Sequence, residues 1–243
     1  MTDSSLAVIV LAAGQGTRMR SSRPKILHEL AGIPLVAHVL ATARELDAAH
    51  VLTVVRHERD VVSELVLEMF PSTVIIEQDE LPGTGRAVQL AVSQLPEGFS
   101  GRVVVLSADV PLLDAATVLG LLASHDASGN ALTMISAFFN DPTGGGRVVR
   151  GTDGSFEAIV EHRDATEEQL LLTEVNAGVY VFDVAALRSV LESIGSSNSQ
   201  NEMYLTDAAA GIRAAGGQIE AVPVSDHWLV AGINDRAQLS AVA

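Results

Sequence analysis

The sequence predicts an α/β protein with a doubly wound, mostly parallel sheet and an inserted β-hairpin region, formed by one domain over residues 1–243. Two observations predict this class. Short β-branched apolar runs alternate with segments of helical periodicity before residue 140, which is typical of parallel strands buried on both faces and joined by helical crossovers. After residue 140, glycine-rich turns separate short strand-like runs. This change indicates an insertion into the sheet.

The individual elements follow from the same patterns. Pro34 suits the first helical position, and apolar residues recur at helical spacing from Leu35 to Leu46. Two strands are expected about the turn 151–154, a helix capped by Asp183 should run to about Ile194, and a further helix should occupy 206–216. Strands are also expected at the apolar runs 6–12, 50–55, 73–77, 102–107 and 173–182.

Composition narrows the functional classes. The formal net charge of −15 opposes binding to nucleic acid or to an anionic membrane surface. The sequence has no apolar run of membrane-spanning length, and its start lacks the pattern of a signal peptide, so a cytoplasmic protein is expected. Since there is no cysteine, a metal has to be held by Asp, Glu, Asn or His, which favours a hard ion such as Mg²⁺.

The loop after the first expected strand has the chemistry of a phosphate site. Its sequence, GQGTRM at 14–19, places glycines where backbone N–H groups can approach a phosphate. It is neither a dinucleotide fingerprint, because Met19 occupies the last position, nor a P-loop. Arg18, Arg20, Arg23 and Lys25 follow within eight residues, and Lys25 is the only lysine beside fourteen arginines. A phosphate ligand for Arg18 and Lys25 is the functional interpretation; a solvated basic turn is the alternative, especially for Arg20 and Arg23.

These residues carry a resemblance to a known family. LAAGQGTRM followed by PK resembles the signature of the sugar-phosphate nucleotidyltransferases. The blocks QDELPGTGRAV, SADVPLLD, DPTGGGRVV, IVEHRDAT, EVNAGVYVF and NEMYLTD extend the resemblance, in the same order, to the uridyltransferase domain of the bifunctional N-acetylglucosamine-1-phosphate uridyltransferases. The resemblance implies a Rossmann-like nucleotidyltransferase fold that transfers UMP from UTP to N-acetylglucosamine 1-phosphate and releases pyrophosphate, for cell-wall precursor synthesis.

The resemblance also implies roles for individual residues. Arg18 and Lys25 would be catalytic, and Asp109 and Asn234 would hold Mg²⁺. From the residues alone, Asp109 is also acceptable as a helix-capping or turn residue, Asn234 as the cap of the last helix, and Glu161 as a surface carboxylate. The implied nucleotide contacts are Leu11, Ala12, Ala13, Gly14, Lys25, Gln78, Gly83 and Thr84. The implied sugar contacts are Thr84, Gly146, Glu161 and Asn176.

The sequence departs from the family pattern at several points. Gln15 stands where many members carry lysine. Ser107 and Gly145 stand where aromatic residues are common, so fewer aromatic side chains are expected to line the sugar pocket. No hexapeptide repeats are present for the family's acetyltransferase β-helix domain, so that domain is expected to be absent from this chain. A homo-oligomer is possible, especially if a missing C-terminal domain trimerises. Two other functions stay open: a related transferase for another nucleotide or sugar 1-phosphate, and a non-catalytic nucleotide-sugar sensor.

Overall fold

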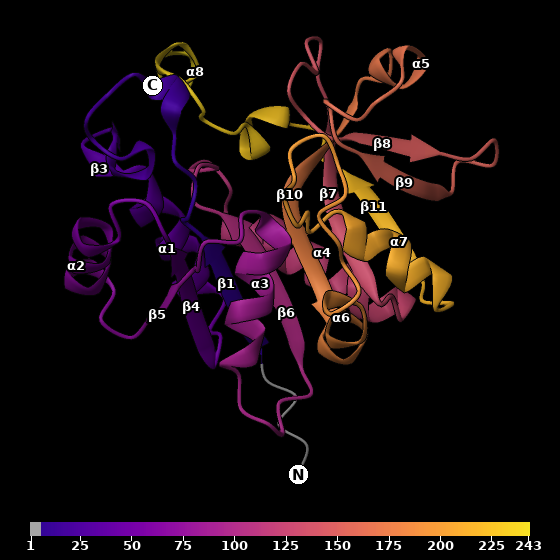
Figure 1. Cartoon of the computed structure of the whole chain (residues 1–243), viewed down its shortest axis with the longest axis horizontal. Helices are drawn as coiled ribbons and strands as arrows, with labels where there is room; N and C mark the ends of the chain where they lie inside the picture. Colours follow the sequence, from indigo (N-terminus) through magenta and orange to yellow (C-terminus); the bar gives the residue numbers. More distant parts are fainter. Residues whose placement is uncertain (1–5) are drawn as a thin grey trace.

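A computed structural model describes residues 6–243 and is built around one large mixed sheet (Figure 1). Its strand order is β11-β7-β10-β6-β1-β4-β5, and the pair β8 and β9 joins through β10. Figure 1 shows β8 and β9 projecting from one end of this sheet, as an insertion would. The predicted class, a doubly wound and mostly parallel sheet with an inserted hairpin, is confirmed.

The parallel half contains the strands that the β-branched runs predict. It comprises β1 (Leu6–Leu11), β4 (His50–Val55), β5 (Val74–Glu77) and β6 (Arg102–Ser107). Strand β1 pairs in parallel with both β4 and β6, and β4 pairs in parallel with β5. Such pairing requires crossovers, which are supplied by α1 (Leu35–Glu45), α2 (Arg59–Met69) and α3 (Thr84–Ser93).

The sheet separates two apolar cores. Alternate residues of β1 point to opposite faces, so Ala7 and Ile9 belong to one core and Val8 and Val10 to the other. On the first face lie α3, α6 (Val184–Leu191) and α7 (Asp207–Ala214). On the second lie α1, α2 and α4 (Ala115–Ser128). Helices on both faces explain why the strands are apolar throughout their length.

The second half of the sheet contains the change of direction. Strand β10 (Glu174–Asp183) is antiparallel to β6 and to β7 (Leu132–Phe138), and β7 pairs in parallel with β11 (Ile219–Pro223). The hairpin β8 (Arg147–Arg150) and β9 (Phe156–Val160) encloses the predicted turn. The short elements are β2 (Glu29–Leu30), β3 (Ile33–Pro34), α5 (Glu167–Leu170), α8 (Arg236–Val242) and the 3₁₀ turns η1 (Thr17–Met19), η2 (Lys25–Leu27) and η3 (His227–Val230).

The carboxyl ends of β1, β4, β5 and β6 meet at one edge, where open α/β sheets bind their ligands. Loops of very different sequence position therefore converge there. Over residues 6–243, none of the helices has both the length and the apolar character needed to cross a bilayer.

Candidate active site

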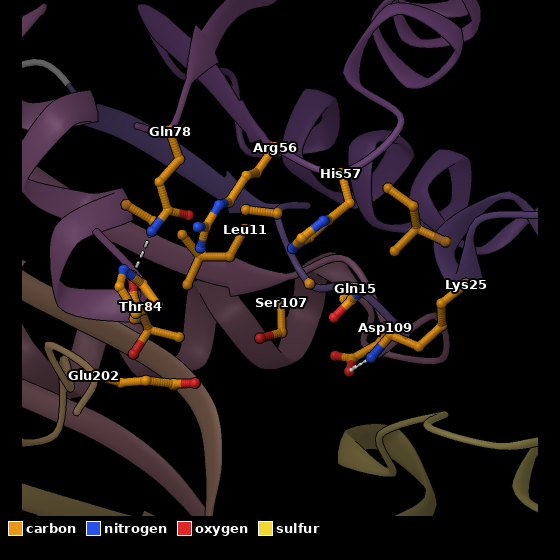
Figure 2. A pocket seen from close by; sticks show the side chains of 16 residues that line it. Leu11, Gln15, Lys25, Arg56, His57, Gln78, Thr84, Ser107, Asp109 and Glu202 are labelled. Atoms are coloured by element: carbon orange, nitrogen blue, oxygen red, sulfur yellow. Dashed lines mark hydrogen bonds and ion pairs between the residues drawn. The ribbon is translucent and has the colours of Figure 1, made fainter. Parts of the chain in front are cut away.

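Two adjoining cavities lie at the edge of the sheet where the carboxyl ends of β1, β4, β5 and β6 meet. The first, of about 450 Å³, is drawn in Figure 2 and lies over the ends of β1, β4, β5 and β6. The second, of about 340 Å³, lies beside the insertion and β10. Thr84, Ser107 and Asp109 line both cavities, so a group bound at Asp109 is in reach of ligands on either side.

The glycine loop after β1 holds Lys25 at the first cavity. Gly16 has a φ of +64°, and a Cβ there would lie 2.4 Å from the Cβ of Lys25, so glycine is needed both for the backbone and for the close approach. Buried Met19, Ile26 and Leu27 anchor the segment beneath. Lys25 then begins η2 directly after Pro24, and its side chain is only 10% exposed.

Lys25 contacts both Asp109 and Asn234, the two residues that the family resemblance assigns to metal binding. Its Nζ lies 2.5 Å from Asp109 Oδ2 and donates to Asn234 Oδ1 at 3.1 Å. Arg18 donates to the same Asn234 oxygen at 2.9 Å. Four predicted residues separated by up to 216 positions are therefore brought together in one charged cluster. A single carboxylate cannot balance both cations, so the cluster is suited to an additional anion.

Neither Asp109 nor Asn234 caps a helix, whereas Asp109 does lie in the turn that follows β6. The N-cap of α4 is Asp114, which accepts from Thr117 N at 2.7 Å, and the N-cap of α8 is Asp235. Asp109 lies two residues beyond β6, where its backbone carbonyl accepts from Ile233 N at 2.8 Å. Because Ile233 is fully buried, this bond fixes the neighbouring Asn234 beside Asp109.

The cluster fits a hard divalent cation by its donor chemistry. Asp109 and Asn234 offer a carboxylate and an amide oxygen, and such ions prefer oxygen ligands. Within residues 6–243 no group of three or more His, Cys, Asp or Glu side chains forms a protein cage for a metal. Most ligands would therefore come from phosphate oxygens and water, as is usual for Mg²⁺ with nucleotides.

Gln78 is held in one orientation at the far end of the first cavity (Figure 2). Its Nε2 donates to the carbonyls of Leu81 and Gly83, both at 3.0 Å. Two carbonyl partners fix which end of the amide is the NH₂ group. The Oε1 atom accepts no hydrogen bond within the described chain, so it is available to a donor on a ligand.

The segment after Gln78 is clamped by residues 203–205. Gly83 has a φ of +118°, and a Cβ there would lie 2.2 Å from Met203 O. Gly85 N donates to Met203 O at 2.7 Å, and Leu205 N donates to Thr84 Oγ1 at 3.0 Å. The clamp joins the walls of the two cavities and places Thr84 between them.

The second cavity contains the remaining predicted sugar contacts. Gly146, Glu161 and Asn176 all line it. Glu161 accepts from Thr206 Oγ1 at 3.0 Å, and Asn176 donates to the Tyr180 hydroxyl at 2.5 Å. Burial raises the pKa of the Glu161 carboxyl, the Thr206 hydrogen bond opposes this, and the charges of Asp207, Asp164 and Glu202 raise the pKa further.

The structure places most predicted site residues on a cavity, with one exception. Ala12 is only 3% exposed, packs in the apolar core beneath the loop and lines neither cavity. Sequence reasoning missed several lining residues, because their types are common in ordinary loops and strands. They are Arg56, His57, Phe139, Tyr180, Glu202 and Thr206. Phe139 and Tyr180 show that the second cavity keeps aromatic walls despite Ser107 and Gly145.

Comparison with protein-family models shows the class of protein to which the chain belongs. A family model described as the MobA-like NTP transferase domain matches residues 8–143, more than half of the chain. The chain therefore belongs to this family of NTP transferases, as the phosphate loop and the charged cluster indicate.

Individual relatives narrow the comparison further. The chain is 64% identical to the bifunctional protein GlmU of Clavibacter sepedonicus, over 98% of the chain and 48% of that protein. It is 56% identical to GlmU of Leifsonia xyli subsp. xyli, over 100% and 50%, and 48% identical to GlmU of Mycolicibacterium smegmatis, over 96% and 49%. The resemblance seen in the sequence blocks is thus confirmed, and the chain spans about half the length of these curated relatives.

Solved structures agree with the fold. A protein from Bacillus anthracis described as a glucose-1-phosphate thymidylyltransferase superposes with a TM-score of 0.73 at 16% identity, over 98% of this chain and 94% of that one. The inositol-1-phosphate CTP transferase of T. maritima gives 0.72 at 16% identity, over 98% and 93%. At this identity the likeness concerns the fold alone.

Proposed function

We propose that this chain transfers UMP from UTP to N-acetylglucosamine 1-phosphate, giving UDP-N-acetylglucosamine and pyrophosphate. The observation that carries this proposal is the arrangement of two cavities that meet at Asp109, next to the cations Lys25 and Arg18. A nucleotide in the first cavity and a sugar phosphate in the second would have their reacting phosphates at this junction. The similarity to GlmU proteins over nearly the whole chain supports the same substrates.

The reaction needs no protein nucleophile. A phosphate oxygen of the sugar 1-phosphate forms a bond to the α-phosphorus of UTP, and the bond from this phosphorus to the oxygen bridging the β-phosphate breaks. Positioning and charge neutralisation are the main contributions that a protein makes to such a step. Lys25 would stabilise charge at the α-phosphate and Arg18 charge on the departing pyrophosphate. Asp109 and Asn234 would hold Mg²⁺, whose chemistry when bound is to neutralise phosphate charge.

Gln78 would recognise the base of the nucleotide by hydrogen bonding. The edge of uracil presents O2, N3–H and O4, which are an acceptor, a donor and an acceptor. The free Oε1 of Gln78 suits the N3–H group, whereas cytosine has a lone pair at this atom. We therefore expect UTP to be preferred over CTP, since an unmatched buried polar group is costly.

The direct test is pyrophosphate release by the 243-residue protein with UTP and N-acetylglucosamine 1-phosphate, with and without Mg²⁺. Release that requires both substrates and the metal is expected. A panel of other nucleoside triphosphates and sugar 1-phosphates checks the related transferases. Nucleotide binding without any pyrophosphate release would instead indicate a nucleotide-sugar sensor.

We expect N-acetylglucosamine 1-phosphate to be preferred over glucose 1-phosphate. Glu161, Asn176 and Gly146 provide a polar side of the second cavity, while Phe139 and Tyr180 provide apolar surface. Ser107 and Gly145 provide no aromatic ring, and losing contact with one methyl group reduces discrimination by roughly tenfold or more. The measurement is kcat/KM for both sugars in the wild type and in Glu161→Ala. Equal values in the wild type, or an unaltered KM in Glu161→Ala, would contradict the sugar-site assignment.

Acceptor binding should depend on pH through Glu161. Because burial raises the pKa of this carboxyl, it is protonated at a higher pH than an ordinary glutamate as pH falls. Loss of the carboxylate acceptor should raise KM for the sugar phosphate over that interval. The second pKa of a phosphate monoester is about 6, so the substrate phosphate also takes up a proton as pH falls. Glu161→Gln is therefore the control: it should lose the Glu161 step and keep the phosphate step. Because folding disfavours the charged carboxyl, Tm at pH 7 should stay equal or rise in this variant.

A further inference from the structure

Arg56 lines the first cavity, where the nucleotide would bind, and it has no part in the proposed reaction. It is the first residue after β4, it is half-buried, and it lines the first cavity together with Leu11 and Gln78. Figure 2 shows its guanidinium directed toward the Gln78 end of this cavity and away from Lys25 and Asp109. Arg56 thus lies at the end opposite the charged cluster.

The guanidinium is held in place by a hydrogen bond but forms no ion pair within residues 6–243. Arg56 donates to the carbonyl of Glu80 at 2.9 Å, which belongs to the same loop that Gln78 fixes through Leu81 and Gly83. Within residues 6–243 it makes no ion pair, and its other N–H groups make no hydrogen bond. Five N–H groups are available on an arginine, so several remain for a ligand.

Two neighbouring arginines, Arg59 and Arg86, differ from Arg56 in that each forms an ion pair. Arg59 pairs with Glu77 at 2.5 Å, and Arg86 pairs with Asp79. Neither of them lines the first cavity. Of these three arginines, Arg56 is the one without an ion pair among residues 6–243, and it is also the one that lines the first cavity, in a protein of formal net charge −15.

We propose that Arg56 is a specificity-determining residue that donates a hydrogen bond to O4 of the base, the carbonyl oxygen that uracil has and cytosine lacks. The inference rests on the proposed function. Gln78 Oε1 provides the central acceptor, and the Gly83 N–H, which donates no hydrogen bond within the described chain, provides a donor from the loop. Arg56 provides the second donor. Together they form a donor, acceptor and donor pattern complementary to uracil, whereas cytosine presents an amino group and a lone pair where uracil has a carbonyl and an N–H.

The test is calorimetric titration of the protein with UTP, CTP and inorganic tripolyphosphate, in Mg²⁺ and without the sugar phosphate so that no turnover occurs. Arg56→Met should raise Kd for UTP about tenfold, the scale of one hydrogen bond from a charged group. The Kd values for CTP and tripolyphosphate should change less than twofold. Arg56→Lys should weaken UTP binding by an intermediate factor, because it keeps the charge and loses the fixed planar donor geometry.

Controls separate a base contact from other roles. Arg59→Ala removes a paired arginine three residues away and should leave all three Kd values unchanged, and melting curves should show that both Arg56 variants are folded. An equal loss of UTP and tripolyphosphate binding in Arg56→Met would place Arg56 on the phosphates and overturn the inference. Unchanged UTP binding would overturn it while leaving the proposed function standing. A wild-type protein that fails to bind UTP would overturn both.

Discussion

Lys25→Ala should lower kcat for uridyl transfer by roughly 10²- to 10³-fold, the scale for removing one group that stabilises transition-state charge. Lys25 contacts Asp109 and Asn234 from a largely buried position. Its ammonium is therefore already at the junction of the two cavities before the reaction begins. Such preorganisation makes an electrostatic contribution large, because little solvent has to be rearranged at the moment of reaction.

The matched control is Arg23→Ala. Arg23 lies two residues before Lys25 in the same loop, but it pairs with Glu29 at 2.8 Å and both side chains are 45% exposed. Exposed pairs contribute little to stability, so activity and Tm should change little. A Lys25→Ala enzyme within twofold of the wild type, or an equal loss in Arg23→Ala, would show that the loop contributes only general positive charge.

The parallel half of the fold could be predicted from sequence because its signal is local. Runs such as HVLTVV form strands with the predicted bounds, since β-branched residues buried on both faces leave a continuous apolar pattern. The direction of β10 could not be predicted in this way. An antiparallel strand in the middle of the sheet depends on which partner it meets, and the sequence from Glu174 to Asp183 does not encode that partner locally.

The candidate site, too, could be predicted only where its signal is local in the sequence. Glycine and charge marked the loop at Gly14 to Lys25, and the family resemblance supplied Asp109 and Asn234. Their mutual contacts depend on the buried Ile233 and its backbone bond to Asp109, which no local pattern reveals. The signal for Arg56 was weak: a single arginine at a strand end becomes informative only when its neighbours are seen to be paired and it is not.

Asp109→Asn should reduce uridyl transfer by about 10³-fold or more, and raising Mg²⁺ should restore little of it. Asp109 is the one carboxylate in the cluster with Lys25, Arg18 and Asn234. Replacing it with an amide keeps the shape and removes the negative charge that attracts the metal. Metal stabilisation of phosphoryl charge is worth several kcal/mol, and each 1.36 kcal/mol corresponds to a factor of ten in rate.

Asp114→Asn is the control for this variant, because Asp114 follows the same strand and its role is to cap α4. Asparagine is a comparably good cap, so both activity and Tm should be retained. Mn²⁺ binding in the presence of UTP, followed by electron paramagnetic resonance, gives a readout besides turnover: it should be weakened in Asp109→Asn and normal in Asp114→Asn. Wild-type activity that persists in excess chelator, or metal binding unaffected by Asp109→Asn, would show that Asp109 acts only as the partner of Lys25. In that case the charge at the junction would have to be balanced by Lys25 and Arg18 alone.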